Sequence, residues 1–103
     1  MNTLIVLFNL RSDADPAAYE QWAKSTDLPV VTSLSAVSSF DIYRSVGLFG
    51  SGSPAPYKYV EVIDITDLQQ FGCDLDSATM KKVASEFQSF ADNPVFMLTE
   101  KIS

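Results

Sequence analysis

The pattern of hydrophobic and polar positions along the chain predicts four strands, two of which form a hairpin with a long connecting loop. Thr3–Arg11 (TLIVLFNLR) is a short apolar run rich in β-forming residues, as in a buried strand. Ala36–Leu48 and Tyr57–Thr66 alternate between apolar and polar positions, as strands with two different faces do. Gly47–Pro56 (GLFGSGSPAP) is rich in Gly, Pro and Ser and predicts the loop that joins these two strands. Val95–Ile102 is expected to form the last strand.

The segment between the first two predicted strands has the sequence features of a helix. Asp15 can cap a helix, and Pro16 follows at the position where its missing N–H costs nothing. Pro29 disfavours helical geometry in the residue before it, so the regular helix is expected to end near Asp27. Val30–Leu34 is then left as a separate turn.

The second half of the chain contains the clearest helix. Asp67 can cap a short helical segment that runs through Phe71. Ser77–Asp92 has the spacing of an amphipathic helix, which Asn93-Pro94 stops. Its apolar stripe consists of Met80, Val83, Ala84, Phe87 and Ala91.

The resulting order is βαββαβ, which predicts an α+β, ferredoxin-like fold. In this arrangement both helices cover one face of a four-stranded antiparallel sheet. We expect one such domain over residues 1–103. The uncovered face of the sheet needs a ligand or a second subunit, so we expect a homodimeric α/β barrel.

The alternation along each strand predicts which side chains lie on the uncovered face. Val60 and Val62 are expected to face the helices, which leaves Tyr59, Glu61 and Ile63 on the open face. The same reasoning assigns Leu4, Val6, Phe8, Phe40 and Ile42 to the helix side and Ile5, Leu7, Asn9, Asp41 and Tyr43 to the open side.

Composition excludes several classes of function. The chain has 13 acidic and 7 basic residues and a net charge of −6, which disfavours binding to nucleic acids and anionic membranes. It has no histidine, so the usual histidine-based nucleophile arrangements and imidazole metal sites are excluded. The lone Cys73 cannot form an intrachain disulfide and fits a reducing cytoplasm. No apolar run is long enough to span a bilayer.

Four segments carry a resemblance to a known family. These are DPAAYEQW, LSAVSSFDIYR, PYKYVEVIDITDL and FADNPVFMLTEKI, which together extend over almost the whole chain. In this combination the chain resembles the RedY-like family of small proteins encoded with prodigiosin-type tripyrrole and bisindole pathways.

The resemblance implies a dimeric α/β barrel without a metal or organic cofactor. It also implies that the protein acts on, or shelters, an aromatic or pyrrolic intermediate, and that other pathway enzymes are possible partners. Family members proposed as enzymes are linked to condensation or cyclisation around pyrrole or indole units. A histidine-based mechanism does not transfer, because this sequence has no histidine.

Glu61 is the strongest candidate for catalysis. A carboxyl group in an apolar cavity has a raised pKa and can act as acid or base near neutral pH. Tyr43 is expected to reach it across the hairpin and to place a phenol O–H on the substrate. The alternative for Glu61 is an ordinary exposed charge, or an ion pair with Arg44 or Lys101.

Five further residues are candidate substrate contacts. Asn9 can orient a substrate or bond to a strand-end backbone group, and Arg44 can clamp a carboxylate or form a surface ion pair. Trp22 lies at helical spacing and is more typical of a core residue. Asp41 and Tyr59 are polar groups expected to line the same cavity.

Three functions therefore remain open at the level of sequence. The first is condensation or cyclisation of an aromatic or pyrrolic intermediate, with confinement supplying much of the rate. The second is a non-catalytic carrier that shields such an intermediate. The third is cofactor-independent oxygenation, a chemistry found on the same architecture.

Overall fold

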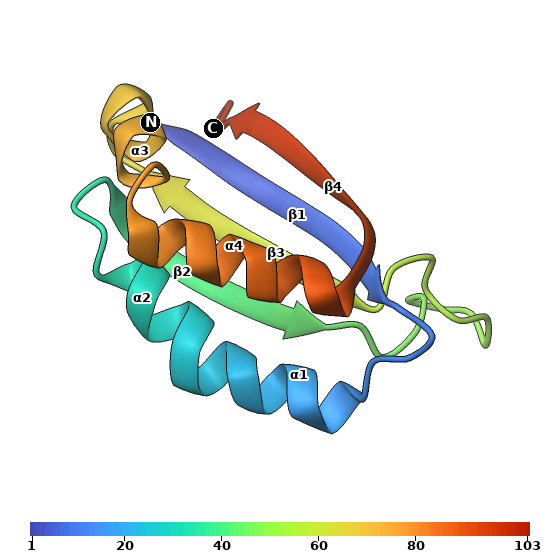
Figure 1. Cartoon of the computed structure of the whole chain (residues 1–103). Coiled ribbons are helices and arrows are strands. Elements are labelled where there is room, and N and C mark those ends of the chain that lie inside the picture. The colour runs from blue at the N-terminus through green and yellow to red at the C-terminus, as the bar shows by residue number, and fades with distance from the viewer.

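The computed structural model describes residues 1–103 and has the predicted ferredoxin-like architecture (Figure 1). One antiparallel sheet has the strand order β2-β3-β1-β4. The strands are β1 (Asn2–Leu10), β2 (Val37–Arg44), β3 (Tyr59–Ile65) and β4 (Ala91–Glu100). The helical segments are α1 (Pro16–Trp22), η1 (Ala23–Asp27), α2 (Leu28–Thr32), α3 (Leu68–Asp74) and α4 (Ala78–Phe90).

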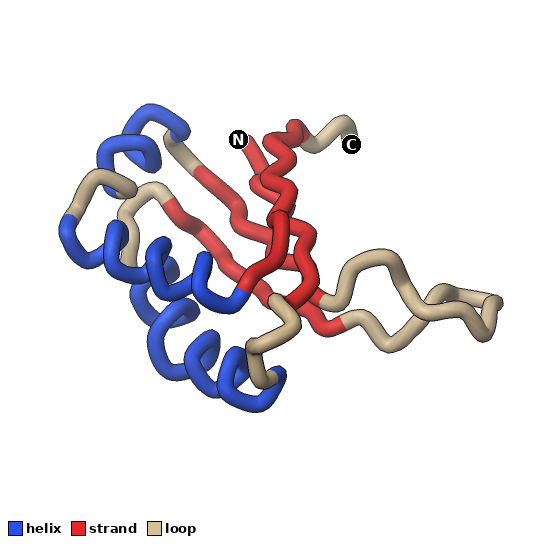
Figure 2. Tube along the Cα trace, turned by 45° about the vertical axis from the view of Figure 1, so that its right-hand side comes forward, coloured by secondary structure: helices blue, strands red, loops and turns tan.

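The helices lie together on one face of the sheet, as the element order predicts (Figures 1 and 2). The connection between β2 and β3 projects beyond the end of the sheet (Figure 2). None of the helices combines the length and the apolar character needed to cross a membrane.

The first helical region does not end near Asp27. It continues through a π-helical turn, η1, into α2, so the prediction that Pro29 ends the helix is wrong. In the wide turn the N–H of Leu28 donates to the carbonyl of Ala23, five residues back. Because the ordinary bonding pattern is already interrupted there, the missing N–H of Pro29 disturbs the helix little.

The two later helices begin where the sequence predicts. The Asp67 side chain accepts a hydrogen bond from the Gln70 N–H, and Ser77 Oγ accepts one from the Met80 N–H. Helix α4 ends at Phe90, two residues before the predicted end. Asn93 has a φ of 45°, which asparagine tolerates better than most residues, and lies at the irregular start of β4.

The register of the sheet reverses the predicted faces of β3. Glu61 lies opposite Val6 on one side and Ile42 on the other, and Tyr59 lies opposite Phe8. Directly opposed residues share a face, and Val6 and Phe8 are buried under the helices. Glu61 and Tyr59 therefore point towards the helices, and the prediction that they lie on the open face is wrong.

Both faces of β3 are apolar, which is why alternation alone misassigned them. Val60 and Val62 lie on the open face, and Asp64 shares that face. The opposite set includes Tyr59, Ile63 and Ile65, which are larger and fill the core beneath the helices. The predicted faces of β1 and β2 are confirmed by the same register.

Two apolar clusters form the core between helices and sheet. The first lies around α2, α3 and the adjoining ends of β2 and β3 and contains Val31, Ala36, Val37, Phe40, Ile63, Ile65, Phe71 and Met80. The second contains Val6, Phe8, Tyr19, Ala23, Tyr59, Phe87 and Ala91. Along β3, Glu61 stands between Tyr59 of the second cluster and Ile63 of the first.

Candidate functional site

A cavity of about 240 Å³ lies between the sheet and the helices. Its walls are mostly apolar, and its lining includes Phe96 and Leu75, which are 59% and 42% exposed and mark its mouth. The lining residues are Leu4, Val6, Asp27, Val31, Phe40, Glu61, Ile63, Phe71, Leu75, Met80, Val83, Ala84, Phe87, Gln88 and Phe96.

Asp27 and Glu61 are the two buried charged residues of the chain, and both line this cavity. Each is only 5% exposed. Asp27 comes from the last position of the π turn, and Glu61 comes from the middle of β3. The sheet and the helical layer thus each supply one carboxyl group to the same apolar space.

The environment of the pair favours protonated carboxyl groups. Burial raises the pKa of Glu61, and the nearby charge of Asp27 raises it further. Burial also raises the pKa of Asp27. Glu61 Oε2 is buried without a hydrogen-bond partner. A pair of this kind can hold a proton near neutral pH and can pass it to a bound molecule.

Tyr19 of α1 is a third buried polar group close to this pair. Its side chain is fully buried, and its hydroxyl has no hydrogen-bond partner. Burial raises the pKa of Tyr19 strongly, and the charges of Glu61 and Asp27 add to the effect. The phenol therefore stays protonated and is available as a hydrogen-bond donor.

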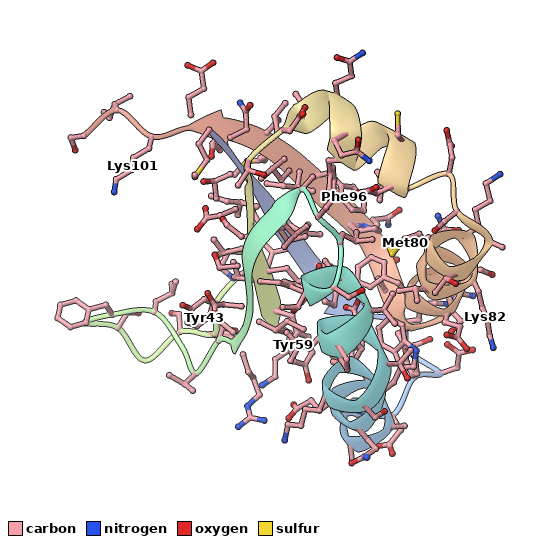
Figure 3. All side chains as sticks on the ribbon, turned by 90° about the vertical axis from the view of Figure 1, so that its left-hand side faces the viewer. Tyr43, Tyr59, Met80, Lys82, Phe96 and Lys101 are labelled. Carbon is pink, nitrogen blue, oxygen red and sulfur yellow. The ribbon has the colours of Figure 1, made fainter.

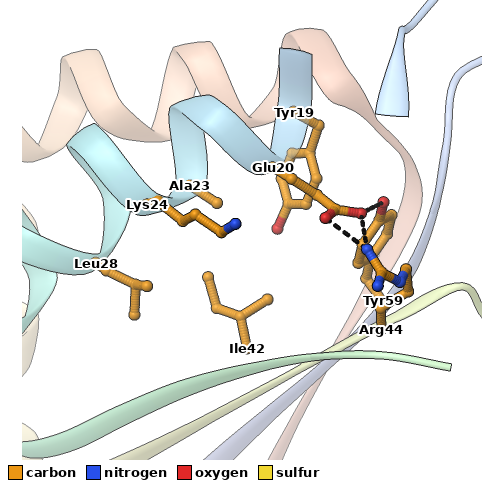
Figure 4. A pocket seen from close by; sticks show the side chains of 8 residues that line it. All are labelled: Tyr19, Glu20, Ala23, Lys24, Leu28, Ile42, Arg44 and Tyr59. Carbon is orange, nitrogen blue, oxygen red and sulfur yellow. Dashed lines mark hydrogen bonds and ion pairs between the residues drawn. The ribbon is translucent and has the colours of Figure 1, made fainter. Parts of the chain in front are cut away.

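A smaller cavity of about 110 Å³ lies between α1, η1 and α2 and the ends of β2 and β3 (Figure 4). Arg44 Nη1 donates to both carboxylate oxygens of Glu20, at 2.6 and 2.8 Å, and Tyr59 Oη donates to Glu20 Oε2 at 2.8 Å. The Arg44 bond lowers the pKa of Glu20. Burial and the bond to Glu20 raise the pKa of Tyr59 to about 12. Glu20, Arg44 and Tyr59 therefore satisfy one another, whereas the hydroxyl of Tyr19, which also lines this cavity, has no hydrogen-bond partner.

The two predicted catalytic residues lie on opposite faces of the sheet. Tyr43 is opposite Val60 on the open face and is 56% exposed, whereas Glu61 points towards the helices. Figure 3 shows Tyr43 and Tyr59 on the two sides of the sheet. The prediction that Tyr43 reaches Glu61 is therefore wrong, because neighbouring residues in a strand alternate between faces.

The predicted contact residues are scattered around the molecule. Asn9 uses its amide on the backbone, donating to the Pro56 carbonyl and accepting from the Lys58 N–H. Asp41 is exposed on the open face. Arg44 and Tyr59 belong to the Glu20 cluster of the smaller cavity.

Trp22 belongs to the aromatic packing of the helical layer. It is half-buried and contacts Tyr19 and Phe90, with ring centroids 6.1 and 5.5 Å away. Its Nε1 donates to Glu86 Oε1 at 3.2 Å. This position agrees with the core role that its helical spacing favours.

Sequence reasoning missed Asp27 and Tyr19. Asp27 marked the expected end of a helix, and an acidic residue at such a position is ordinarily exposed. The one available signal was its place between the apolar positions Ala23 and Val31, at helical spacing on a buried face. Tyr19 carried only the signature of a core residue.

Asp27 and Glu61 have no third metal-ligating side chain beside them. No three His, Cys, Asp or Glu side chains come together in an arrangement that could hold a metal ion. What the geometry offers is a proton-holding pair in an apolar cavity. Fold and site together define a ferredoxin-like α+β protein with an internal acidic cavity.

Comparison with known proteins identifies the family. The family described as REDY-like protein HapK matches residues 2–102. The chain is 30% identical to HapK from Hahella chejuensis, with a TM-score of 0.79, over 100% of this chain and 94% of that one. The chain therefore belongs to the REDY-like HapK family. No curated protein matches its sequence.

More distant structures share the fold. A dimeric ferredoxin-like protein from Thermobifida fusca is 17% identical, with a TM-score of 0.74 over 97% of this chain and 90% of that one. SnoaB from Streptomyces nogalater, a cofactor-independent oxygenase crystallised as a mutant, is 15% identical, with a TM-score of 0.78 over 99% of this chain and 93% of that one. At this identity the likeness concerns the fold alone.

Proposed function

We propose that the protein binds a flat aromatic or pyrrolic intermediate in the larger cavity and promotes its condensation, with Asp27 and Glu61 transferring the proton. The observation that carries the proposal is a buried carboxyl group, one oxygen of which (Oε2) has no hydrogen-bond partner, in an apolar space beside a second carboxyl group. Membership of the REDY-like family supports a role in biosynthesis.

The dimensions of the cavity favour a small ligand. Its volume of about 240 Å³ lies just below the range of about 300–1,000 Å³ found for small-molecule sites. Four phenylalanines line it, and their rings suit the faces of a flat conjugated molecule. They are Phe40, Phe71, Phe87 and Phe96.

The pair can serve both proton transfers of a condensation. When a pyrrole ring carbon attacks an aldehyde carbon, a C–C bond forms and the carbonyl oxygen takes a proton from the protonated carboxyl. The ionised carboxyl then accepts the proton that the ring carbon loses. Loss of the new hydroxyl with a further proton releases water and leaves a conjugated cation. No oxidant is needed, and general acid–base catalysis of this kind typically supplies about 10²–10⁴-fold.

The test uses two simple probes, pyrrole-2-carboxaldehyde and 2,4-dimethylpyrrole, which condense to a coloured dipyrromethene. Purified protein should accelerate the appearance of the colour. Glu61→Gln keeps the shape of the side chain and removes its proton transfer, so we expect the catalysed rate to fall at least about tenfold, or 1.4 kcal/mol. Asp27→Asn should give a similar loss.

Asp41→Asn is the matched control, because it makes the same chemical change on the opposite face of the sheet. It should leave the rate unchanged. If Asp41→Asn slows the reaction and Glu61→Gln does not, the site lies on the open face and the proposal is wrong. Tight probe binding without turnover would indicate the carrier function, and oxygen consumption would indicate oxygenation.

A further inference from the structure

The larger cavity contains two carboxyl groups, and no basic side chain balances the negative charge that either of them acquires on ionisation. Its lining has two acidic residues, Asp27 and Glu61, and its one other polar residue is the neutral Gln88. All seven lysines and arginines of the chain are exposed, and none of them lines the cavity. Arg44, which sequence reasoning considered as a partner for Glu61, is bound to Glu20 instead.

We propose that the cavity selects a planar, delocalised cation, of the class of protonated conjugated imines and dipyrromethenes. This inference rests on the proposed function, since it concerns the same cavity, and it adds the charge of the ligand. An ionised carboxyl that is buried without a partner is costly. A bound cation with an N–H group would donate to the free Oε2 of Glu61 and offset the charge of the pair.

The walls favour a delocalised cation over a compact ammonium group. An ammonium ion is strongly hydrated, and its three donors require more polar partners than this apolar cavity offers. A flat ring system that spreads its charge loses less hydration. It can also contact the aromatic rings of Phe71 and Phe87, which line the cavity and whose π-electrons attract positive charge.

Charge selection would also assist the proposed condensation. The conjugated cation appears only when the hydroxyl of the adduct leaves as water. A site that binds this cation better than the neutral starting materials stabilises the step that forms it. The cavity would then bind its product firmly and depend on a later reaction to consume it.

The test compares three probes that share one ring system. At neutral pH 4-aminoquinoline is a delocalised cation, quinoline is neutral, and quinoline-4-carboxylate is an anion. Binding is measured by calorimetry, with the fluorescence of the single tryptophan, Trp22, as a second readout, in enough salt to screen the acidic surface. We expect the cation to bind at least about tenfold more tightly than quinoline, and the anion not to bind.

Two variants test whether the carboxyl pair causes the preference for the cationic probe. Glu61→Gln and Asp27→Asn should each reduce the ratio of the affinity for the cation to the affinity for quinoline. Asp41→Asn should keep the full preference. Having two variants at the site keeps the test decisive if one of them does not fold.

The outcomes separate this inference from the proposed function. Equal affinities for the cation and quinoline would overturn the inference and leave a neutral-ligand site intact. A preference that persists in both site variants would overturn it as well, because the charge would then be recognised elsewhere. If no probe binds, the inference is overturned, and the condensation assay still decides the proposed function.

Discussion

At the scale of single residues, carboxyl groups of one chain occupy opposite environments. Asp64 accepts hydrogen bonds from Thr3 Oγ1 at 2.7 Å and Ser39 Oγ at 2.8 Å, and these bonds lower its pKa. Asp27 and Glu61 are buried in an apolar space, which raises theirs. Burial and hydrogen bonding, not residue type, decide which carboxyl groups hold a proton at neutral pH.

This contrast predicts how stability depends on pH. The folded protein keeps protons on Asp27 and Glu61 at pH values where the unfolded chain has lost them. The free energy of unfolding should therefore fall as pH rises from the usual carboxyl range through the raised pKa values. Each unit by which a pKa is raised corresponds to about 1.4 kcal/mol.

Glu61→Gln removes the contribution of Glu61, so its stability should decline less than that of the wild type between about pH 5 and about pH 9. Urea unfolding at each pH measures the difference. The titratable groups that act on Glu61 are Asp27 from η1 and Tyr19 from α1, and the other lining residues are apolar apart from Gln88. Asp41→Asn should follow the wild type. Parallel curves for wild type and Glu61→Gln would contradict the assigned environment.

At the scale of elements, the helical layer determines what covers Glu61. The π turn places Asp27 over the sheet, and α4 contributes Met80, Val83 and Phe87 to the cavity wall. Wide turns of this kind are frequent at functional sites. The first turn of α4 is held by the Ser77 cap at 3.1 Å, three residues before the first of these wall residues.

Ser77→Ala should therefore destabilise the protein by about 1 kcal/mol, because the Met80 N–H loses its acceptor. Chemical denaturation measures this loss. Ser85→Ala makes the same substitution at an exposed position of the same helix, where alanine is the better helix former, and should cause no loss of stability. Equal effects of the two substitutions would show that the cap contributes nothing.

At the scale of the whole molecule, the open face of the sheet is apolar at its centre and polar at its β2 edge. Two rows of side chains cross this face from β2 through β3 and β1 to β4. The first row consists of Asp41, Val62, Ile5 and Met97, and the second consists of Tyr43, Val60, Leu7 and Val95. The edge strand β4 exposes four consecutive large apolar side chains, Val95 to Leu98. Such a face and edge are typical of a surface that a second subunit covers.

We therefore predict a homodimer in solution at micromolar concentration, in which the two open faces pack together. Val62→Lys places a charge at the centre of this face and should shift the protein to monomers, because burying an unpaired charge is costly. Thr79→Lys, at an exposed position on the helix side, should remain dimeric. Light scattering distinguishes the states, and a wild-type mass of only 11.3 kDa would refute the prediction.

The secondary-structure elements, their order and the starts of the helices could be predicted from the sequence, because these depend on local causes. Caps such as Asp67 and Ser77 and the apolar stripe of α4 act within a few residues. The same local patterns indicated the βαββαβ order and hence a sheet with helices on one face. The lack of histidine excluded imidazole chemistry without any structure.

The face that Glu61 occupies and the groups that surround it could not be predicted from the sequence, because they depend on tertiary packing. Both faces of β3 are apolar, so its orientation depends on its register with β1 and on the larger side chains that the helices must cover. Asp27 reaches Glu61 from 34 positions earlier in the chain, through a π turn that no local pattern announces. A site that depends on contacts so distant in sequence is specified by tertiary packing, and local secondary-structure propensities do not predict it.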